Sequence, residues 1–222
     1  GREVEMRIGD IGFVGMVDRA RFDPYLRARA ERAGARLFHG KLVAMTEQTD
    51  RTLHLTLTAS DADPAAPPLT IGARMVIGAD GANSTVRRLM FPANQRPRYV
   101  FAYHEIIESP AGGQNPAFDP GRCDVIYDGR ISPDFYGWVF PHGDHTSVGC
   151  GSGVKGHDLR HATADLRLSS GLGSCKVVRR EGAPLPLKPM RRWDNGRNVL
   201  LAGDAAGTVA PASGEEIGRA HV

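Results

Sequence analysis

The sequence has few cysteines and no long apolar run. Its 3 cysteines, Cys123, Cys150 and Cys175, are far apart and form no C-x-x-C pair. This pattern argues against a disulfide framework or a zinc site and favours buried thiols in a reducing compartment. No run approaches the roughly 18 apolar residues of a transmembrane helix, and nothing has the form of a signal peptide. We therefore expect no metal, and any membrane contact should be peripheral.

A strong charge of either sign is also missing. The 222 residues contain 28 Lys and Arg against 25 Asp and Glu, which gives a formal net charge of +3. The most Arg-rich stretch, residues 19–32, is interleaved with acidic and apolar residues. That composition favours a solvated helix face over a nucleic-acid-binding surface. We expect no nucleic-acid partner.

No dinucleotide-binding G-x-G-x-x-G fingerprint occurs in the context that it requires. The nearest run, GSGVKG at residues 151–156, follows an expected antiparallel strand in the middle of the chain. The fingerprint binds a pyrophosphate only where it joins a strand to a helix in a βαβ unit. We therefore dismiss this run as a nucleotide site.

The patterns that are present predict an α/β fold with an inserted α+β sheet. Parallel strands with helices are expected at both chain ends, and an antiparallel sheet between them. In the first helix, Asp18 is the expected N-cap and Gly34 the expected end. The other expected elements are strands at 35–48, 52–59 and 73–80, a Pro/Ala loop at 60–70, a short helix at 81–90, antiparallel strands within 99–151, a helix at 158–172, an extended piece at 175–189 and a last buried strand at 198–206.

Two short apolar strands are expected to be buried on both faces, as strands of parallel sheets are. Each delivers small residues and an aspartate, Asp80 or Asp204, at its carboxyl end. In open parallel sheets that end is where ligands bind, and Gly and Ala let backbone approach a ligand closely. Each carboxylate could accept hydrogen bonds from sugar-like hydroxyls, while Arg87 and Arg88 could bind phosphate. The alternative for either motif alone is a strand followed by an Asp N-cap.

Both motifs resemble those of FAD-dependent oxidoreductases of the para-hydroxybenzoate hydroxylase type. GADGANSTVR at 78–87 resembles the family's middle motif, which is associated with FAD and NAD(P)H, and NVLLAGDAAG at 198–207 resembles its Gly-Asp motif. DRARFD at 18–23 resembles the opening of a family helix. The resemblance implies that Asp204 contacts the ribityl chain of FAD. It implies cofactor-binding roles for Arg19, Asp80, Gly81, Arg87, Gly203, Asp204, Pro211 and Gly214.

The inserted sheet narrows the resemblance to geranylgeranyl reductases. SPDFYGWVFPHGDHTSVGCG at 132–151 is similar to their P-x-x-Y-x-W-x-F-P segment, and VAPASGE at 209–215 is also in place. VFAYHEII, FDPGRCDVIYDG and REGAPLPLKP are similar to enzymes of (bacterio)chlorophyll synthesis, so the resemblance runs from Val14 to Glu215. It implies FAD and NADPH as cofactors and reduction of three C=C bonds, which turns geranylgeranyl into phytyl. The substrate would be geranylgeranylated bacteriochlorophyll or geranylgeranyl diphosphate. The location would be cytoplasmic, peripheral at the photosynthetic membrane.

Three alternating aromatic residues, Tyr136, Trp138 and Phe140, share one face of the expected strand. They could form the floor for a prenyl chain, or they could be core aromatics. By the same resemblance, residues 211–214 would lie just before a helix whose N-terminus stabilises anionic reduced flavin. The proton donor stays open, and the catalytic residues are unknown. Tyr136 and the histidines of the sheet (His104, His142 and His145) are the candidates considered.

We predict the following division of the chain: residues 1–98 as a partial FAD/NAD(P)H-binding domain, 99–190 as an antiparallel substrate-binding domain and 191–215 as the return to the first domain. Residues 216–222, EIGRAHV, are what GAG ATC GGA AGA GCA CAC GTC encodes, the start of a common short-read sequencing adapter. Our hypothesis is that this tail is an artefact and that the chain is truncated at both ends. Without the phosphate-binding unit, we expect the 222-residue chain to expose an apolar sheet edge, bind FAD poorly and fold badly.

Other functions fit the same patterns. An archaeal-type reductase of membrane ether lipids and an aromatic hydroxylase would share the fold. A non-catalytic prenyl-lipid binding protein would keep the fold without redox chemistry.

Overall fold

The structure is a computed structural model that describes residues 4–5, 17–59, 67–93, 97–111 and 115–209. By packing, the chain divides into two units, residues 1–37 and 38–222, which are considered separately. The division predicted above, at residues 98/99 and 190/191, stays a prediction.

Helix α1 (Arg19–Arg32) is the described element of the first unit. It begins after Asp18, whose carboxylate accepts a hydrogen bond from the Ala20 amide at 2.9 Å. It ends just before Gly34, whose φ of +96° favours glycine. Both predicted helix ends are confirmed. None of the helix's residues is buried.

A three-stranded antiparallel sheet opens the second unit. The predicted strand at 35–48 is shorter than expected, because residues 35–40 are not part of it. The predicted loop at 60–70 was wrong at its end, since Leu69 already pairs with Leu57 of the neighbouring strand. Backbone pairing there prevails over the proline-rich composition, and both prolines of 67–68 stand before the first pair. The strands, in order, are β1 (Lys41–Glu47), β2 (Leu53–Thr58) and β3 (Leu69–Ala73).

The two strands that carry the aspartate motifs, β4 (Val76–Gly78) and β10 (Val199–Leu201), form a parallel pair. Helix α2 (Thr85–Met90) packs closely on one face of this pair. Gly78 allows the close approach, since an added Cβ there would lie 2.8 Å from the Val86 side chain. The prediction that these strands are buried on both faces was wrong. Ile77 is 59% exposed and Leu200 37% exposed. Within the described residues, the core cluster lies on the face of Val76 and Leu201 only.

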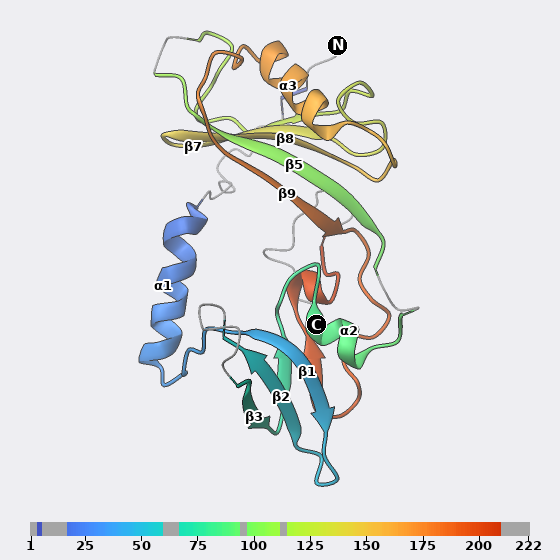
Figure 1. The fold of residues 1–222 in the computed structure, drawn as a ribbon. Helices are drawn as coiled ribbons and strands as arrows, with labels where there is room; N and C mark the ends of the chain where they lie inside the picture. The colour runs from blue at the N-terminus through green and yellow to red at the C-terminus, as the bar shows by residue number, and fades with distance from the viewer. Residues whose placement is uncertain (1–3, 6–16, 60–66, 94–96, 112–114, 210–222) are drawn as a thin grey trace. The chain divides into compact units, whose positions relative to one another are not determined.

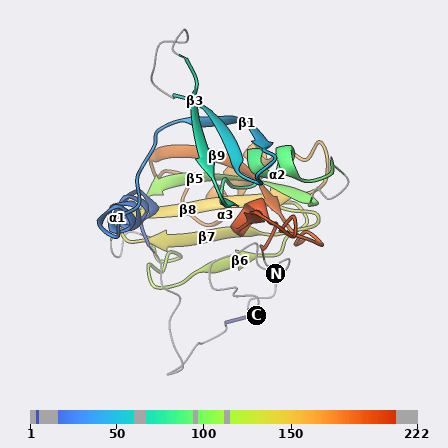
Figure 2. The ribbon, with the colours of Figure 1, turned by 90° about the horizontal axis from the view of Figure 1, so that it is seen from below.

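The antiparallel sheet expected in the middle of the chain is confirmed, and with it the α/β class with an inserted sheet. Figure 2 shows its strands side by side in the order β6–β7–β8–β5–β9. All neighbouring pairs are antiparallel. The GSGVKG run lies at the end of antiparallel β8 and not in a βαβ unit, which agrees with the view that it is no nucleotide site. The strands are β5 (Tyr99–Glu108), β6 (Asp124–Ile126), β7 (Gly137–His142), β8 (His145–Ser152) and β9 (Val177–Pro186).

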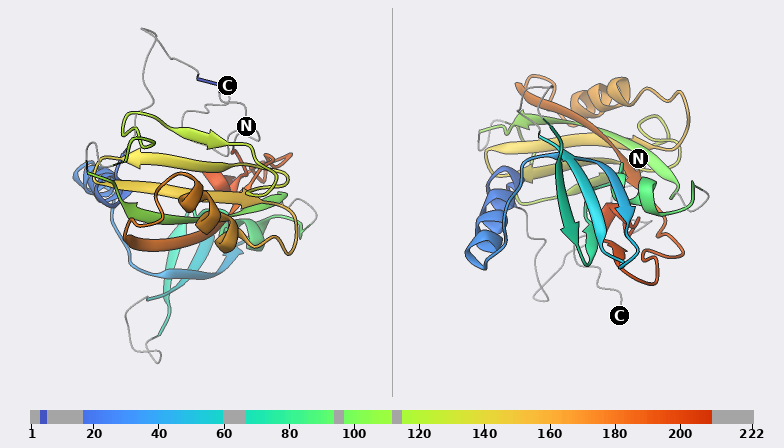
Figure 3. Two further views of the ribbon diagram at one scale, coloured as in Figure 1. Left: turned by 90° about the horizontal axis from the view of Figure 1, so that it is seen from above. Right: turned by 60° about the horizontal axis from the view of Figure 1, so that its bottom comes forward.

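Helix α3 (Leu159–Ser169) covers one face of this sheet, as Figures 1 and 3 show. A core cluster that includes Val139, Val148 and Leu166 lies between the helix and the strands. The prediction of buried thiols holds for Cys150, which is fully buried. Burial raises the pKa of the Cys150 thiol, although a hydrogen bond with Thr163 opposes the shift. The prediction was wrong for Cys123, which is exposed on the surface.

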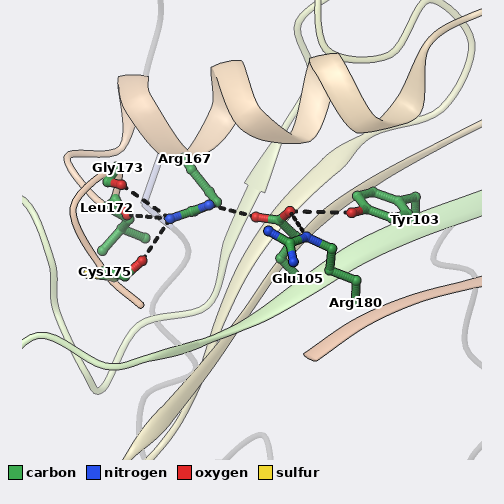
Figure 4. Close-up of polar contacts among 7 residues, drawn as sticks. All are labelled: Tyr103, Glu105, Arg167, Leu172, Gly173, Cys175 and Arg180. Carbon is green, nitrogen blue, oxygen red and sulfur yellow. Dashed lines mark hydrogen bonds and ion pairs between the residues drawn. The ribbon is translucent and has the colours of Figure 1, made fainter. Parts of the chain in front are cut away.

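A buried carboxylate, Glu105 of β5, links α3 to the sheet (Figure 4). Its carboxylate lies 2.6 Å from Arg167 Nη1 of α3 and 3.0 Å from Arg180 Nε of β9. Arg167 also donates to backbone carbonyls beyond the helix, including that of Cys175 at 2.8 Å. Burial alone would raise the pKa of Glu105, but the hydrogen bonds and charges of the two arginines outweigh it and lower this pKa.

We predict that Glu105→Gln destabilises the protein by about 3 kcal/mol at neutral pH, because it leaves the guanidinium of Arg167 without its anion. A carboxyl whose pKa is lowered on folding adds stability above its ordinary value and loses it in acid. The difference between parent and variant should therefore be complete above pH 4.5 and shrink as the pH falls below it. Urea unfolding at several pH values measures this difference.

The matched control is Glu108→Gln on the same strand, since Glu108 pairs with Lys176 at the surface, where the side chains are 51% and 74% exposed. That change should cost less than about 0.5 kcal/mol. Equal losses for the two variants would contradict a special role for the buried carboxylate.

Candidate functional site

The two aspartate motifs come together at one edge of the parallel pair. Val76 pairs with Val199 and Gly78 with Leu201, so Asp80 and Asp204 both follow the carboxyl ends of adjacent strands. Gly81 and Gly203 have φ of +76° and +58°, and among the described residues beyond their chain neighbours no atom lies within 4 Å of an added Cβ at either position. The loops therefore present backbone that a ligand can approach closely, which is the arrangement that ligand sites in such sheets use.

The carboxylate of Asp80 also has a local structural use. It accepts hydrogen bonds from the amide of Thr85 at 2.6 Å and the hydroxyl of Ser84 at 2.6 Å. The Ser84 hydroxyl in turn accepts from the Arg87 amide, so Ser84 is the N-cap of α2. The capping alternative thus describes the local geometry, with Ser84 rather than Asp80 as the cap. A cofactor contact by Asp80 and Gly81 stays a prediction.

The buried guanidinium of Arg87 joins the two motifs. Its Nη1 donates to the carbonyls of Ala205 at 2.7 Å and Asp204 at 3.4 Å. Its Nη2 donates to the carbonyl of Ala82 and to the Tyr99 hydroxyl, the latter at 2.7 Å. Arg87 is only 7% exposed. We therefore assign it to positioning the loops, and the direct cofactor contact predicted for it stays a prediction.

The Gly-Asp loop forms one tight turn. Residues Gly203–Ala205 are a 3-10 helix, and the amide of Ala206 donates to the carbonyl of Gly203 at 2.9 Å. Met190 reaches over to donate its amide to the carbonyl of Ala206 at 3.0 Å. Asp204 is half-buried in this turn. A carboxylate beside open glycine backbone, with small neighbours, fits the polyol portion of FAD, whose hydroxyl groups can donate hydrogen bonds to it.

The other predicted cofactor residues either belong to the first unit or fall outside the described residues. Arg19, on α1 in the first unit, forms a bidentate pair with Asp23 at 2.7 and 2.9 Å and is 62% exposed. This pair lowers the pKa of Asp23. Pro211 and Gly214 lie outside the described residues, as does the 216–222 tail.

Trp138 and Phe140 lie on β7, on the face opposite α3, and Tyr136 directly precedes this strand. The Tyr136 and Trp138 rings are 6.0 Å apart, and the Trp138 and Phe140 rings 6.3 Å apart and stacked. Their intervening neighbours, such as Val139, point to the α3 core. Tyr136 is buried, while Trp138 and Phe140 are half-buried. We call this row the aromatic floor.

The strand-end loops and the aromatic floor each include residues that the sequence did not predict. Tyr99, which accepts from Arg87, donates its hydroxyl to the Ala82 carbonyl at 3.2 Å. Ser147 and Gly149 of β8 lie opposite Phe140 and Trp138. The alternating pattern of 145–151 could have placed them on that face, but not identified which neighbour they would touch.

The described part of the chain offers neither a membrane-spanning helix nor a metal-binding cluster. No helix there has the length and apolarity to cross a bilayer. No group of three or more His, Cys, Asp or Glu side chains there could hold a metal ion.

We predict that Arg87→Met destabilises the protein by about 2–4 kcal/mol, because it removes the donor to the buried Ala205 carbonyl and the hydrogen bonds that join the two loops. The neighbouring Arg88 is the matched control, since it is exposed and donates to Thr85 Oγ1 at 3.1 Å. Arg88→Met should change stability by less than about 0.5 kcal/mol. Urea unfolding measures both, and similar values for the two would contradict the positioning role.

Comparisons with known proteins show what the chain is similar to. Residues 9–101 match the FAD binding domain family. A geranylgeranyl diphosphate reductase of Rhodobacter capsulatus is 49% identical over 221 residues, covering 100% of this chain and 54% of the relative. A chloroplastic geranylgeranyl diphosphate reductase of Nicotiana tabacum is 35% identical, covering 92% of this chain and 44% of the relative. The chain thus spans about half the length of these curated relatives.

A solved structure supports the same fold. The crystal structure of a geranylgeranyl bacteriochlorophyll reductase-like protein from Thermoplasma acidophilum matches with a TM-score of 0.71. The match covers 89% of this chain and 49% of the other at 22% identity, so it speaks for the fold alone. Over the length that it covers, this chain is therefore similar to the geranylgeranyl diphosphate reductases, and its residues 9–101 match the FAD binding domain family.

Proposed function

We propose that the full-length protein reduces a geranylgeranyl group to phytyl, with FAD as the resident cofactor and NADPH as the reductant. The observation that carries the proposal is the aromatic floor, present in a chain 49% identical to a geranylgeranyl diphosphate reductase along its whole length. Geranylgeranylated bacteriochlorophyll and geranylgeranyl diphosphate are the two proposed substrates.

The aromatic floor suits a prenyl chain because neither the rings nor the isoprenoid requires a directional contact such as a hydrogen bond. A C20 isoprenoid is apolar and flexible, and aromatic rings offer a large apolar surface at low conformational cost. The Trp138 and Phe140 rings leave part of their area accessible on the side of the sheet that α3 does not cover. Burying the prenyl chain against them removes both surfaces from water.

The strand-end loops are the proposed FAD-binding part. Asp204 would bind the ribityl hydroxyls, and Gly81 and Gly203 would let the backbone come close to the cofactor. When bound, reduced flavin supplies the hydride equivalent that an unactivated alkene cannot obtain from a side chain. The protein's own residues would hold both loops in place, through Arg87, and keep water away from the prenyl group.

The location is proposed from the chemistry of the substrate. A pigment or diphosphate with a C20 tail partitions into bilayers, so the enzyme must meet it at a membrane surface. We propose a cytoplasmic protein in peripheral contact with the photosynthetic membrane.

Incubating the full-length protein with FAD, NADPH and geranylgeranylated bacteriochlorophyll should give a stepwise gain of two hydrogens, three times over, in the pigment mass. Substituting NADH for NADPH tests the choice of nicotinamide. No mass change in a flavoprotein that NADPH reduces would move the proposal to the free diphosphate or to an ether lipid. A flavin that NADPH does not reduce would favour a prenyl-lipid binding protein.

Trp138→Ala should raise the KM for the prenyl substrate about tenfold or more, because it removes a large part of the floor's apolar area. Bound flavin, measured by absorbance, should stay within about twofold, since the floor is separate from the strand-end loops. Leu168→Ala is the control, because that side chain is 68% exposed on α3. Parallel loss of flavin and of substrate use in Trp138→Ala would instead assign Trp138 to the core.

A further inference from the structure

One cross-strand row leads from the aromatic floor to the edge of the sheet. In register, Trp138 of β7 lies opposite Gly149 of β8, Gly149 opposite His104 of β5, and His104 opposite Glu181 of β9. All four positions therefore share the face of the floor. An added Cβ at Gly149 would lie 2.5 Å from the Trp138 ring and 2.5 Å from His104 Cβ. The glycine lets the indole and imidazole meet over β8, with ring centroids 6.2 Å apart.

The hydroxyl of Ser147 connects the two rings. The Trp138 indole donates its Nε1–H to Ser147 Oγ at 3.0 Å. His104 Nδ1 lies 2.9 Å from the same oxygen, and His104 Nε2 lies 3.0 Å from Glu181 Oε2. Ser147 itself is buried, at 7% exposure. Four side chains thus form one continuous network at the edge of the floor.

The donors and acceptors available in this network determine the direction of each of its hydrogen bonds. An indole can only donate, so Ser147 Oγ accepts from Trp138. In the neutral imidazole, the single Ser147 proton then goes to His104 Nδ1, and Nε2–H donates to Glu181. When His104 is protonated, Nδ1–H donates to Ser147 instead, and the Ser147 proton must turn away. Protonation of His104 therefore reverses a hydrogen bond at the oxygen that holds the indole.

The charged surroundings of His104 on this face come mainly from β9. Glu181 accepts from His104 and also pairs with Arg179 Nε at 2.8 Å. From β8, the neighbours are uncharged Ser147 and Gly149. Further along β5 and β8 on the same face lie Glu108 and His145, in register with each other, with Lys176 and His142 beside them.

We propose that His104, Ser147 and Glu181 are positioning residues that orient the Trp138 indole for a prenyl chain, and that the protonation state of His104 is passed to this indole through the Ser147 hydroxyl. The nature of the ligand rests on the proposed function. The network itself rests on the contacts alone.

The first experiment needs no substrate. The Trp138 signal is the difference in tryptophan emission between the full-length protein and its Trp138→Phe variant. It should fall as the pH is lowered and His104 takes up a proton, because an imidazolium in contact quenches indole emission. His104→Gln keeps hydrogen-bonding groups but does not titrate, so the pH step should disappear. His145→Gln is the control and should retain it. A parent signal independent of pH, or a step that persists in His104→Gln, overturns the network.

The second experiment measures binding of geranylgeraniol in mixed micelles through quenching of the Trp138 signal. Ser147→Ala should raise the apparent Kd about tenfold, as expected for one lost hydrogen bond that orients the ring. Ser147→Thr retains the hydroxyl and should recover most of the affinity. Ser109→Ala removes a hydroxyl bonded to Thr146 at 2.8 Å, and should leave the Kd unchanged.

These outcomes separate the inference from the proposed function. An unchanged Kd in Ser147→Ala, or equal losses in Ser147→Ala and Ser147→Thr, overturns the positioning role. A protein that shows the His104-dependent step and the Ser147-dependent affinity, but reduces no prenyl group, keeps the network and loses the proposed reductase activity.

Discussion

The buried guanidinium of Arg87 is the interaction on which the strand-end site depends. Two loops more than a hundred residues apart, at 82 and 204–205, have their carbonyl groups turned toward one charged side chain. Neither loop has a regular element that fixes it to the other beyond the short β4–β10 pair. Tyr99 brings the first residue of the antiparallel sheet to the same guanidinium. One side chain therefore sets the relation between both motifs and the start of β5, and small errors there would move Asp204.

Alternate side chains of β5 have different roles, one set in the core under α3 and the other on the face of the aromatic floor. Glu105 points to α3, where two arginines satisfy it, and His104 points to the opposite face, where it meets the floor. The same backbone thus holds a buried ion pair and a candidate ligand surface. Because residues one apart lie on opposite faces, a change of register by one residue would exchange the two and destroy both. Pairing with β8 and β9 along nearly the whole strand protects this register.

The sequence predicted most of what depends on local periodicity and on the family's motifs. The antiparallel strands, the α1 caps and the shared face of Tyr136, Trp138 and Phe140 follow from patterns within a few residues. Contacts between distant residues were out of reach. Nothing near Arg87 says that its guanidinium meets Ala205, and nothing near Ser147 says that it joins Trp138 to His104. The failure at Ile77 has the same origin, since burial depends on which elements cover a strand.

The separation of polar groups from ring faces on the floor bears on how a prenyl chain could be reduced at successive double bonds. Hydrogen bonds on the surface that touches the substrate would favour one position, because they are directional. Here the polar groups bond to one another: Trp138 Nε1 and His104 Nδ1 both face the buried Ser147 oxygen, and Glu181 takes His104 Nε2. A prenyl chain bound there, as proposed, would meet ring faces, whose attraction is proportional to the buried area and changes little when the chain shifts along the floor. Polar groups that bond to one another beside a non-directional surface would therefore suit repeated repositioning of an isoprenoid.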